Sequence, residues 1–142
     1  MQVFRHFPKQ AAQPVALAVG NFDGVHLGHQ ALLKHLLATA QSQHLKSTVM
    51  TFEPHPREFF TPDQAPTRLT SLREKLELFA EAGVEQVYVC QFNSRFAKIT
   101  AEAFMQTIMR DALNARSVLV GQDFRFGAGR KRTVADFAEA GF

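Results

Sequence analysis

Cysteine, tryptophan and long apolar runs are scarce in this sequence of 142 residues, and each scarcity narrows the class of protein. A single cysteine, Cys90, cannot form an internal disulfide, and its place in the apolar run 87–90 predicts a buried, inert thiol in a reducing compartment. No apolar run reaches the ~18 residues that cross a bilayer, and residues 1–6 lack the apolar stretch of a signal peptide. We therefore expect a soluble cytoplasmic protein.

Net charge is also small. Sixteen Lys and Arg against thirteen Asp and Glu give +3, which suits an anionic small molecule as partner but is too little to indicate duplex DNA. The cationic run 130–132 is interpreted as solvated surface, since no motif supports a nucleic-acid role.

Apolar residues make up 46% of the chain, enough for the core of one domain. Fourteen of the aromatic residues are Phe, and we expect most of them to fill that core.

Apolar runs rich in β-forming residues alternate with segments of helical periodicity. The runs lie at 15–19, 47–52, 86–91 and 117–120. Such alternation is typical of parallel strands joined by helices. The sequence therefore predicts an α/β fold, a Rossmann-like doubly wound parallel sheet with helices on both faces, in a single domain over residues 1–142.

Two of the expected helices have clear limits. The first begins near His26 and buries a face of Leu and Ala side chains, which leaves His35 at the surface. The second follows Ser71 in a capping-box pattern and stops at Gly83. Its expected buried residues are Leu72, Leu76, Phe79 and Ala80.

Two more helices are expected in the second half of the chain. One runs from a Thr100 cap to about residue 113, buries Phe104, Ile108 and Ala112, and can end at Asn114. The other begins at Thr133 and reaches Gly141. Because another strand should follow such a helix in a doubly wound fold, we expect a domain truncated at its carboxyl end.

The segment 20–29, with the sequence GNFDGVHLGH, follows the first strand and opens the first helix. It fits neither a Walker A motif nor the Gly-x-Gly-x-x-Gly pattern. Glycines let the backbone approach a bulky anion, and a helix start directs free N–H groups and a positive dipole end toward it. His26 and His29, three residues apart, face the same way on a helical turn. This segment therefore predicts a polyphosphate site.

Two further loops follow strands and should open onto the same edge of the sheet. In the first, Pro54 and Pro56 fix the backbone and remove N–H donors, which favours either a stiff pocket wall or, equally, an ordinary proline-rich turn. In the second, Phe124 and Phe126 share one face if the segment is extended, toward either a ligand or the core.

Four segments in order resemble the amino-terminal FMN adenylyltransferase module of bacterial bifunctional riboflavin kinase/FAD synthetases, within the HxGH nucleotidyltransferases. They are 20–29 (GNFDGVHLGH), 51–56 (TFEPHP), 69–75 (LTSLREK) and 120–127 (VGQDFRFG). The HxGH motif alone is shared with other nucleotidyltransferases, whereas four segments in order are far more specific. The resemblance implies that FMN phosphate attacks the α-phosphorus of ATP, releasing pyrophosphate without a covalent enzyme intermediate.

The resemblance also implies roles for individual residues. His26 and His29 would donate hydrogen bonds to the ATP phosphates as the catalytic pair. The residues that would seat the nucleotide are Gly20, Asn21, Phe22, Asp23, Gly24 and Gly28. Those that would border the flavin are Pro54, Pro56, Phe60 and Phe126. Asp123 stands where relatives carry Asp or Asn. An Asn can contact phosphate without charge repulsion, whereas Asp123 would ligate the Mg²⁺ cofactor more strongly and repel phosphate.

The chain also departs from the family pattern. The family continues with a Ser/Thr-rich segment ending in Arg that closes over ATP, and then with a riboflavin kinase barrel. Neither is present in this sequence, so we expect weak or absent activity from this fragment alone. Two alternatives stay open: a nucleotidyltransferase with another phosphorylated acceptor, and a non-catalytic nucleotide-binding module.

Overall fold

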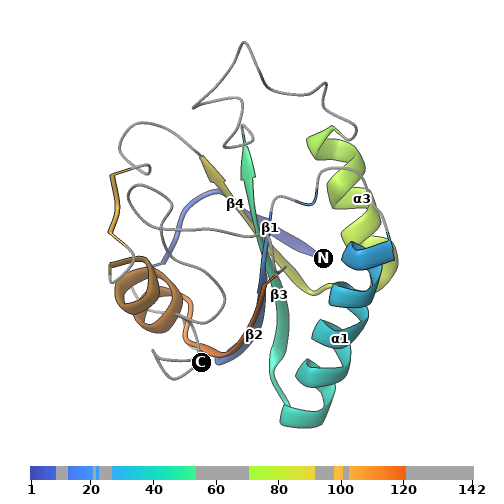
Figure 1. Ribbon diagram of the computed structural model, residues 1–142, viewed down its shortest axis with the longest axis horizontal. Helices are drawn as coiled ribbons and strands as arrows, with labels where there is room; N and C mark the ends of the chain where they lie inside the picture. Colours follow the sequence, from blue (N-terminus) through green and yellow to red (C-terminus); the bar gives the residue numbers. More distant parts are fainter. Residues whose placement is uncertain are drawn as a thin grey trace.

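A parallel sheet of five strands forms the centre of the computed structural model, which describes residues 1–8, 13–20, 22, 27–53, 71–91, 98–100 and 103–120 (Figure 1). The strands are β1 (Gln2–Phe4), β2 (Val15–Val19), β3 (Lys46–Glu53), β4 (Gln86–Gln91) and β5 (Ala115–Val120). All neighbouring pairs are parallel, in the order β1-β4-β3-β2-β5. The four strands that the sequence predicts are confirmed, with ends within two residues of those expected.

The chain reverses direction across the sheet at β2. From β2 it moves outward through β3 to β4, and then returns past both to pair β5 with the other edge of β2. Helices α1 (Leu27–Gln43) and α3 (Leu72–Ala82) cover one face, while η1 (Phe104–Ala112) covers the opposite face (Figure 1). The expected doubly wound α/β fold is therefore confirmed.

Strand β1 lies at the edge of the sheet and was not predicted. Its three residues pair only with β4, from Gln2 beside Gln86 to Phe4 beside Tyr88. Three residues are too few to display the apolar periodicity of a strand. Ring stacking holds the segment in place, because the rings of Phe4 and Phe7 lie 5.0 and 5.7 Å from that of Tyr88. Burial also raises the pKa of the Tyr88 phenol.

The core has two layers, one on each face of the sheet. Strand β2 contributes to both, since all five of its residues are buried and successive side chains point to opposite faces. On the side of α1 and α3 the buried residues include Ala16, Ala18, Leu33, Leu36, Val49, Phe79 and Val87. On the side of η1 they include Leu17, Val19, Met50, Phe52, Cys90, Phe104, Ile108 and Met109.

Helix α3 has the predicted limits but a rotated buried face. Ser71 Oγ accepts a hydrogen bond from Glu74 N at 3.2 Å, and the Ser71 N–H donates to Glu74 Oε1 at 3.4 Å. The helix ends at Gly83, whose φ of 97° favours glycine. Of the residues expected in the core, Phe79 is buried, Leu72 and Leu76 are half-buried and Ala80 is exposed. Lys75 is buried with Phe79 instead. A lysine is buried this far only where it has a partner, and Lys75 has one, which polarity along the sequence does not predict.

The helix expected over residues 100–113 is present as a π-helix rather than an α-helix. Thr100 Oγ1 accepts a hydrogen bond from Ala103 N at 3.1 Å, as predicted for a cap. Leu113 N donates to Ile108 O at 3.0 Å, five residues back, and Asn114 leaves the helix with φ 55°. Phe104, Ile108 and Ala112 are all buried, as expected. The helix predicted from Thr133 lies outside the described residues.

Leu36 offers a test of the layer beneath α1. Its side chain is fully buried against the sheet, whereas the neighbouring His35 is exposed. We expect Leu36→Ala to lower the free energy of unfolding by about 2–5 kcal/mol, and His35→Ala to change it by less than about 0.5 kcal/mol. Urea denaturation followed by circular dichroism measures both. Equal effects of the two substitutions would contradict this packing.

Cys90 offers a test of the opposite layer. Burial raises the pKa of its thiol well above the ordinary value, so the group stays neutral and unreactive near neutral pH. We expect a disulfide reagent to label Cys90 slowly in the native protein and at once in guanidinium, as peptide mapping would show. Because the unfolded thiol ionises near pH ~8.5, its contribution to stability is present below that pH and declines above it. Rapid native labelling would contradict a buried thiol.

Candidate functional site

The centre of the candidate site is the carboxyl end of β2. There Val19 pairs with Met50 of β3 on one side and with Val120 of β5 on the other. The Gly20 N–H donates to Met50 O at 3.1 Å, so the backbone that follows β2 leaves the sheet from between its two neighbours. Open α/β sheets bind ligands at such a reversal, because the loops on either side of it diverge.

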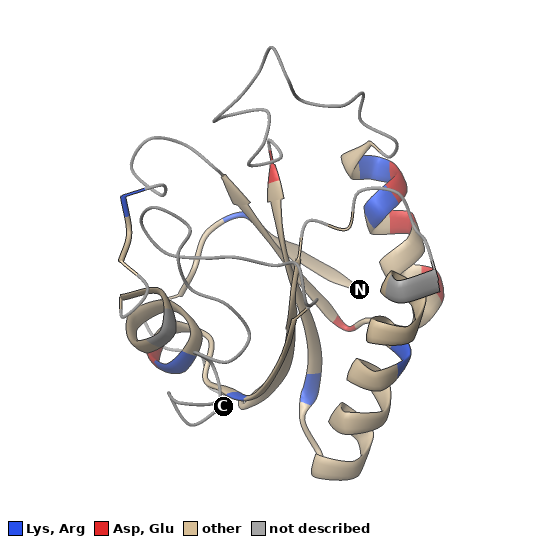
Figure 2. Ribbon diagram, viewed as in Figure 1, with Lys and Arg blue, Asp and Glu red and all other residues tan. Residues whose placement is uncertain are grey.

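Helix α1 begins at this edge. It starts at Leu27, one residue after His26 where the sequence predicted it, and runs back along the sheet for 17 residues (Figure 1). Gly28 and His29 belong to its first turn. That turn contains no acidic residue, and Lys34 is the single Lys, Arg, Asp or Glu of the helix (Figure 2). The backbone N–H groups and positive dipole end of α1 therefore favour an anion here.

Phe22 lies beneath the start of α1. Its ring is 2% exposed and its centroid lies 5.2 Å from that of His29 and 5.1 Å from that of Phe79. Gly20 makes this possible, because a Cβ at position 20 would stand 3.1 Å from Cε2 of the Phe22 ring. The side chain of Phe22 thus belongs to the core. Any contribution of residue 22 to nucleotide binding therefore comes from its backbone.

His29 is half-buried, in contrast to the exposed His35 further along α1. One side of its imidazole meets Phe22, at an interplanar angle of 51°. Its imidazole carries two nitrogen atoms, which can donate or accept hydrogen bonds. Of the predicted catalytic pair, His29 is the member that the structure describes, and it stands in the first helical turn.

Two charged residues near this edge were not assigned a role from the sequence. Glu53 ends β3 at the carboxyl edge (Figure 2). Its Oε2 atom is shielded from solvent. Lys75 is 1% exposed and lies one turn before Phe79 on the buried face of α3. Both side chains have interaction partners. The spacing of Lys75 from Leu72 and Phe79 is the sequence signal that would have placed it on the buried face.

Most of the other predicted site residues lie outside the described part of the chain. They are Asn21, Asp23, Gly24, His26, Pro54, Pro56, Phe60, Asp123 and Phe126. Their loops nevertheless leave from described strands. The segment with Pro54 follows β3 directly, and the one with Asp123 begins just after β5. Because β3 and β5 flank β2, the three loops that carry the predicted site residues start side by side at one edge of the sheet.

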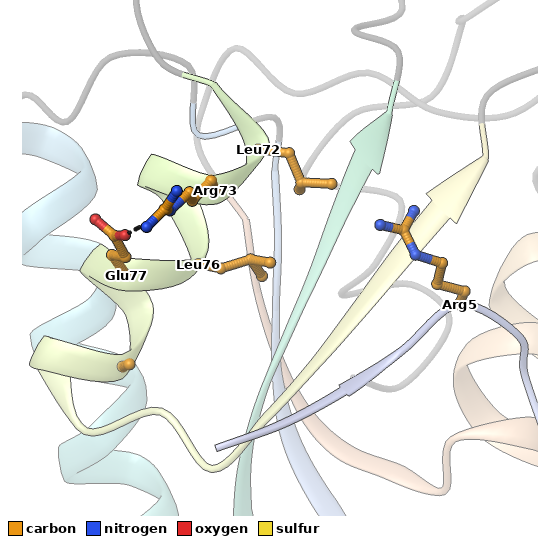
Figure 3. A pocket seen from close by; sticks show the side chains of 6 residues that line it. Arg5, Leu72, Arg73, Leu76 and Glu77 are labelled. Atoms are coloured by element: carbon orange, nitrogen blue, oxygen red, sulfur yellow. Dashed lines mark hydrogen bonds and ion pairs between the residues drawn. The ribbon is translucent and has the colours of Figure 1, made fainter.

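Two surface cavities lie elsewhere. A groove of about 410 Å³ separates β1 from α3 and is lined by Arg5, Leu72, Arg73, Leu76, Glu77 and Ala80 (Figure 3). Arg73 Nε pairs with Glu77 Oε1 at 3.1 Å there, on the solvent side of the helix (Figure 3). A second cavity of about 430 Å³ lies at the amino ends of the strands, beside Pro14, Lys46 and Glu85. Neither includes Gly20 or His29.

Neither a candidate metal centre nor a candidate membrane span is found among the described residues. No group of three or more His, Cys, Asp and Glu side chains gathers there in a way that could hold a metal ion. In the same part of the chain, no helix has the length and apolarity needed to cross a membrane.

Comparison with known proteins gives a consistent result. Residues 8–142 match the family described as FAD synthetase. A bifunctional riboflavin kinase/FMN adenylyltransferase of Escherichia coli (strain K12) is 46% identical over 137 residues, which cover 96% of this chain and 44% of that protein. A protein of the same name from Haemophilus influenzae is 39% identical, with 95% and 44% covered. The chain thus spans less than half the length of these relatives.

A solved structure supports the same fold. The crystal structure of a protein named as a macrolide-efflux protein, from Streptococcus pneumoniae, aligns with a TM-score of 0.82 at 29% sequence identity. The alignment covers 98% of this chain and 55% of that one. Together with the family match over almost the whole chain, these similarities lead to one conclusion: the chain belongs to the FAD synthetase family.

Proposed function

We propose that this chain carries the adenylyl-transfer site of an FMN adenylyltransferase, which transfers AMP from ATP to FMN and releases pyrophosphate. The observation that carries the proposal is the position of Gly28 and His29 in the first turn of α1, at the edge where the chain reverses. Family membership supports the chemistry. The relatives' names support a place for this domain within a longer, bifunctional riboflavin kinase/FMN adenylyltransferase.

The reaction needs little covalent help from the protein. An FMN phosphate oxygen forms a bond to the α-phosphorus, the bond from that phosphorus to the bridging oxygen breaks, and pyrophosphate leaves with the electron pair. Such a displacement is accelerated by holding the two substrates in line and by stabilising the charge on the phosphates. The N–H groups of α1 and the imidazole of His29 are suited to this task, with His26 as the second donor.

The two flanking loops supply the other half of the proposed site. The segment after β3 would bring Pro54, Pro56 and Phe60 to the flavin, and Phe126 would approach from the loop after β5. This division is supported by the sheet order, which starts these loops on opposite sides of β2. Asn21, Asp23 and Gly24 would seat the nucleotide between them.

Mg²⁺ enters the proposal as the cation that accompanies the ATP phosphates. Asp123, its predicted ligand, lies outside the described residues, so the need for Mg²⁺ stays a prediction. Cytoplasmic location is proposed because ATP is a cytoplasmic substrate and the lone cysteine is a buried free thiol.

Removal of either histidine tests the site. We expect His26→Ala and His29→Ala each to lower kcat for FAD formation by about 10²–10³-fold, because a phosphate donor is lost in the transition state. His35→Ala, on the exposed face of the same helix, is the matched control and should leave activity unchanged. Steady-state kinetics of the full-length protein measure these values. A change confined to KM would mean that the histidines bind the ground state only.

The function itself is tested by incubating the full-length protein with ATP and FMN. We expect FAD and pyrophosphate to form one for one, and FMN fluorescence to be quenched on binding. Pyrophosphate release with another phosphorylated acceptor, but not with FMN, would show a different nucleotidyltransferase. Nucleotide binding without any turnover would contradict an enzymatic role.

A further inference from the structure

We propose that Phe22 and Phe79 form a positioning device that fixes the imidazole of His29 from within the core. Phe22 lies between the two other rings, with centroid distances of 5.2 Å to His29 and 5.1 Å to Phe79. The inference rests on the proposed role of His29 as a phosphate donor. On this proposal, Phe79 of α3 influences the rate of adenylyl transfer through His29, with no need to contact the substrates.

The backbone conformation of Phe22 is one that its residue type disfavours, so packing must hold the ring beside His29. Its φ of 54° lies in the left-handed region, which bulky side chains rarely adopt. Such strain persists only where the surrounding structure over-determines it, and it is frequent at ligand sites. Here burial of the ring to 2% exposure holds the residue in place, and Gly20, which has no Cβ, leaves room for the ring.

Phe79 gives the device its rigid support. Its ring meets that of Phe22 at 85°, an edge-to-face geometry that aromatic pairs prefer. The helix that carries Phe79 is fixed at both ends, by the capping box at Ser71 and by Gly83. The Phe79 carbonyl also accepts a hydrogen bond from Val84 N at 3.0 Å, just after the helix. The position of the Phe22 ring is therefore set by α3 as well as by its own backbone.

His29 is the least buried member of the group. It is half-buried in the first turn of a helix, where a histidine side chain can adopt more than one rotamer. A buried aromatic ring against one side of the imidazole removes rotamers that would turn it away. Phe22 has no charge, so its effect is on orientation. A misplaced donor is costly, because a shift of about 1 Å can reduce a rate by ~10²-fold.

The test compares two buried phenylalanines on opposite faces of the sheet. Phe79 is 1% exposed on the α3 side and Phe104 is 2% exposed on the η1 side, so Phe104→Leu is a matched control for Phe79→Leu. In the full-length protein we expect Phe79→Leu to lower kcat for FAD formation by about tenfold with little change in KM. Phe104→Leu should leave kcat unchanged at temperatures where circular dichroism shows both variants folded.

Two further readouts separate positioning from general damage. In a His29→Ala background, Phe79→Leu should cause no additional loss of kcat, because its effect passes through His29. In NMR spectra, the ring protons of His29 should move in Phe79→Leu and stay in place in Phe104→Leu. Equal kcat losses in the two single variants, a full loss in the His29→Ala background, or an unmoved His29 ring would each overturn the proposal.

The design also distinguishes this proposal from the function on which it rests. If the wild-type protein forms no FAD, the proposed function fails, and the NMR comparison alone then decides whether Phe79 sets the position of the His29 ring. If Phe79→Leu does not fold, Phe79→Met replaces it, since the flexible methionine fills irregular core space without supplying an aromatic edge. For Phe79→Met we expect the same NMR shifts of the His29 ring, and the same results would overturn the proposal.

Discussion

The position of β2 between β3 and β5 is the constraint on which the rest of the structure depends. Because β2 is buried on both faces, it must be covered by helices on both sides, and this fixes α1 and α3 on one face and η1 on the other. The same placement puts the start of α1 at the point where the chain reverses. A candidate ligand site at this edge follows from the topology, before the identity of any side chain is considered.

The chemistry proposed for this edge depends mainly on rigid positioning. In-line displacement at phosphorus gains little from a nucleophilic side chain and much from donors held in the right place. The lone cysteine lies in the core as a buried thiol, which agrees with a mechanism that needs no enzyme nucleophile. Phe22 links the core to the proposed phosphate donor, since its ring is buried in the core and lies against that of His29.

Much of the fold could be predicted from the sequence because its signals are local. The apolar runs of the central strands, the capping box at Ser71 and the stop at Gly83 each arise from neighbouring residues. Strand β1 was missed because three residues show no periodicity, and its edge position depends on β4 far along the chain. The π-helical turn of η1 likewise depends on tertiary packing. Lys75 was missed for another reason, because its charge outweighed a spacing that matches the buried face of α3.

As with the fold, the part of the site that could be predicted is the part with a local sequence signal. The spacing of His26 and His29 indicated a donor pair at a helix start, and His29 is found in the first turn of α1. The orientation of Phe22 could not be predicted, because a positive φ and a contact with Phe79 on a distant helix leave no local pattern. The loops carrying Pro54 and Asp123 remain assigned from sequence alone.

The most direct test of the central claim is a crystal structure of the full-length protein with FMN and a non-hydrolysable ATP analogue. The account predicts the triphosphate over the amino end of α1, within hydrogen-bond distance of His29, and the FMN phosphate in line with the α-phosphorus. A triphosphate bound at the amino ends of the strands, or in the groove between β1 and α3, would contradict it.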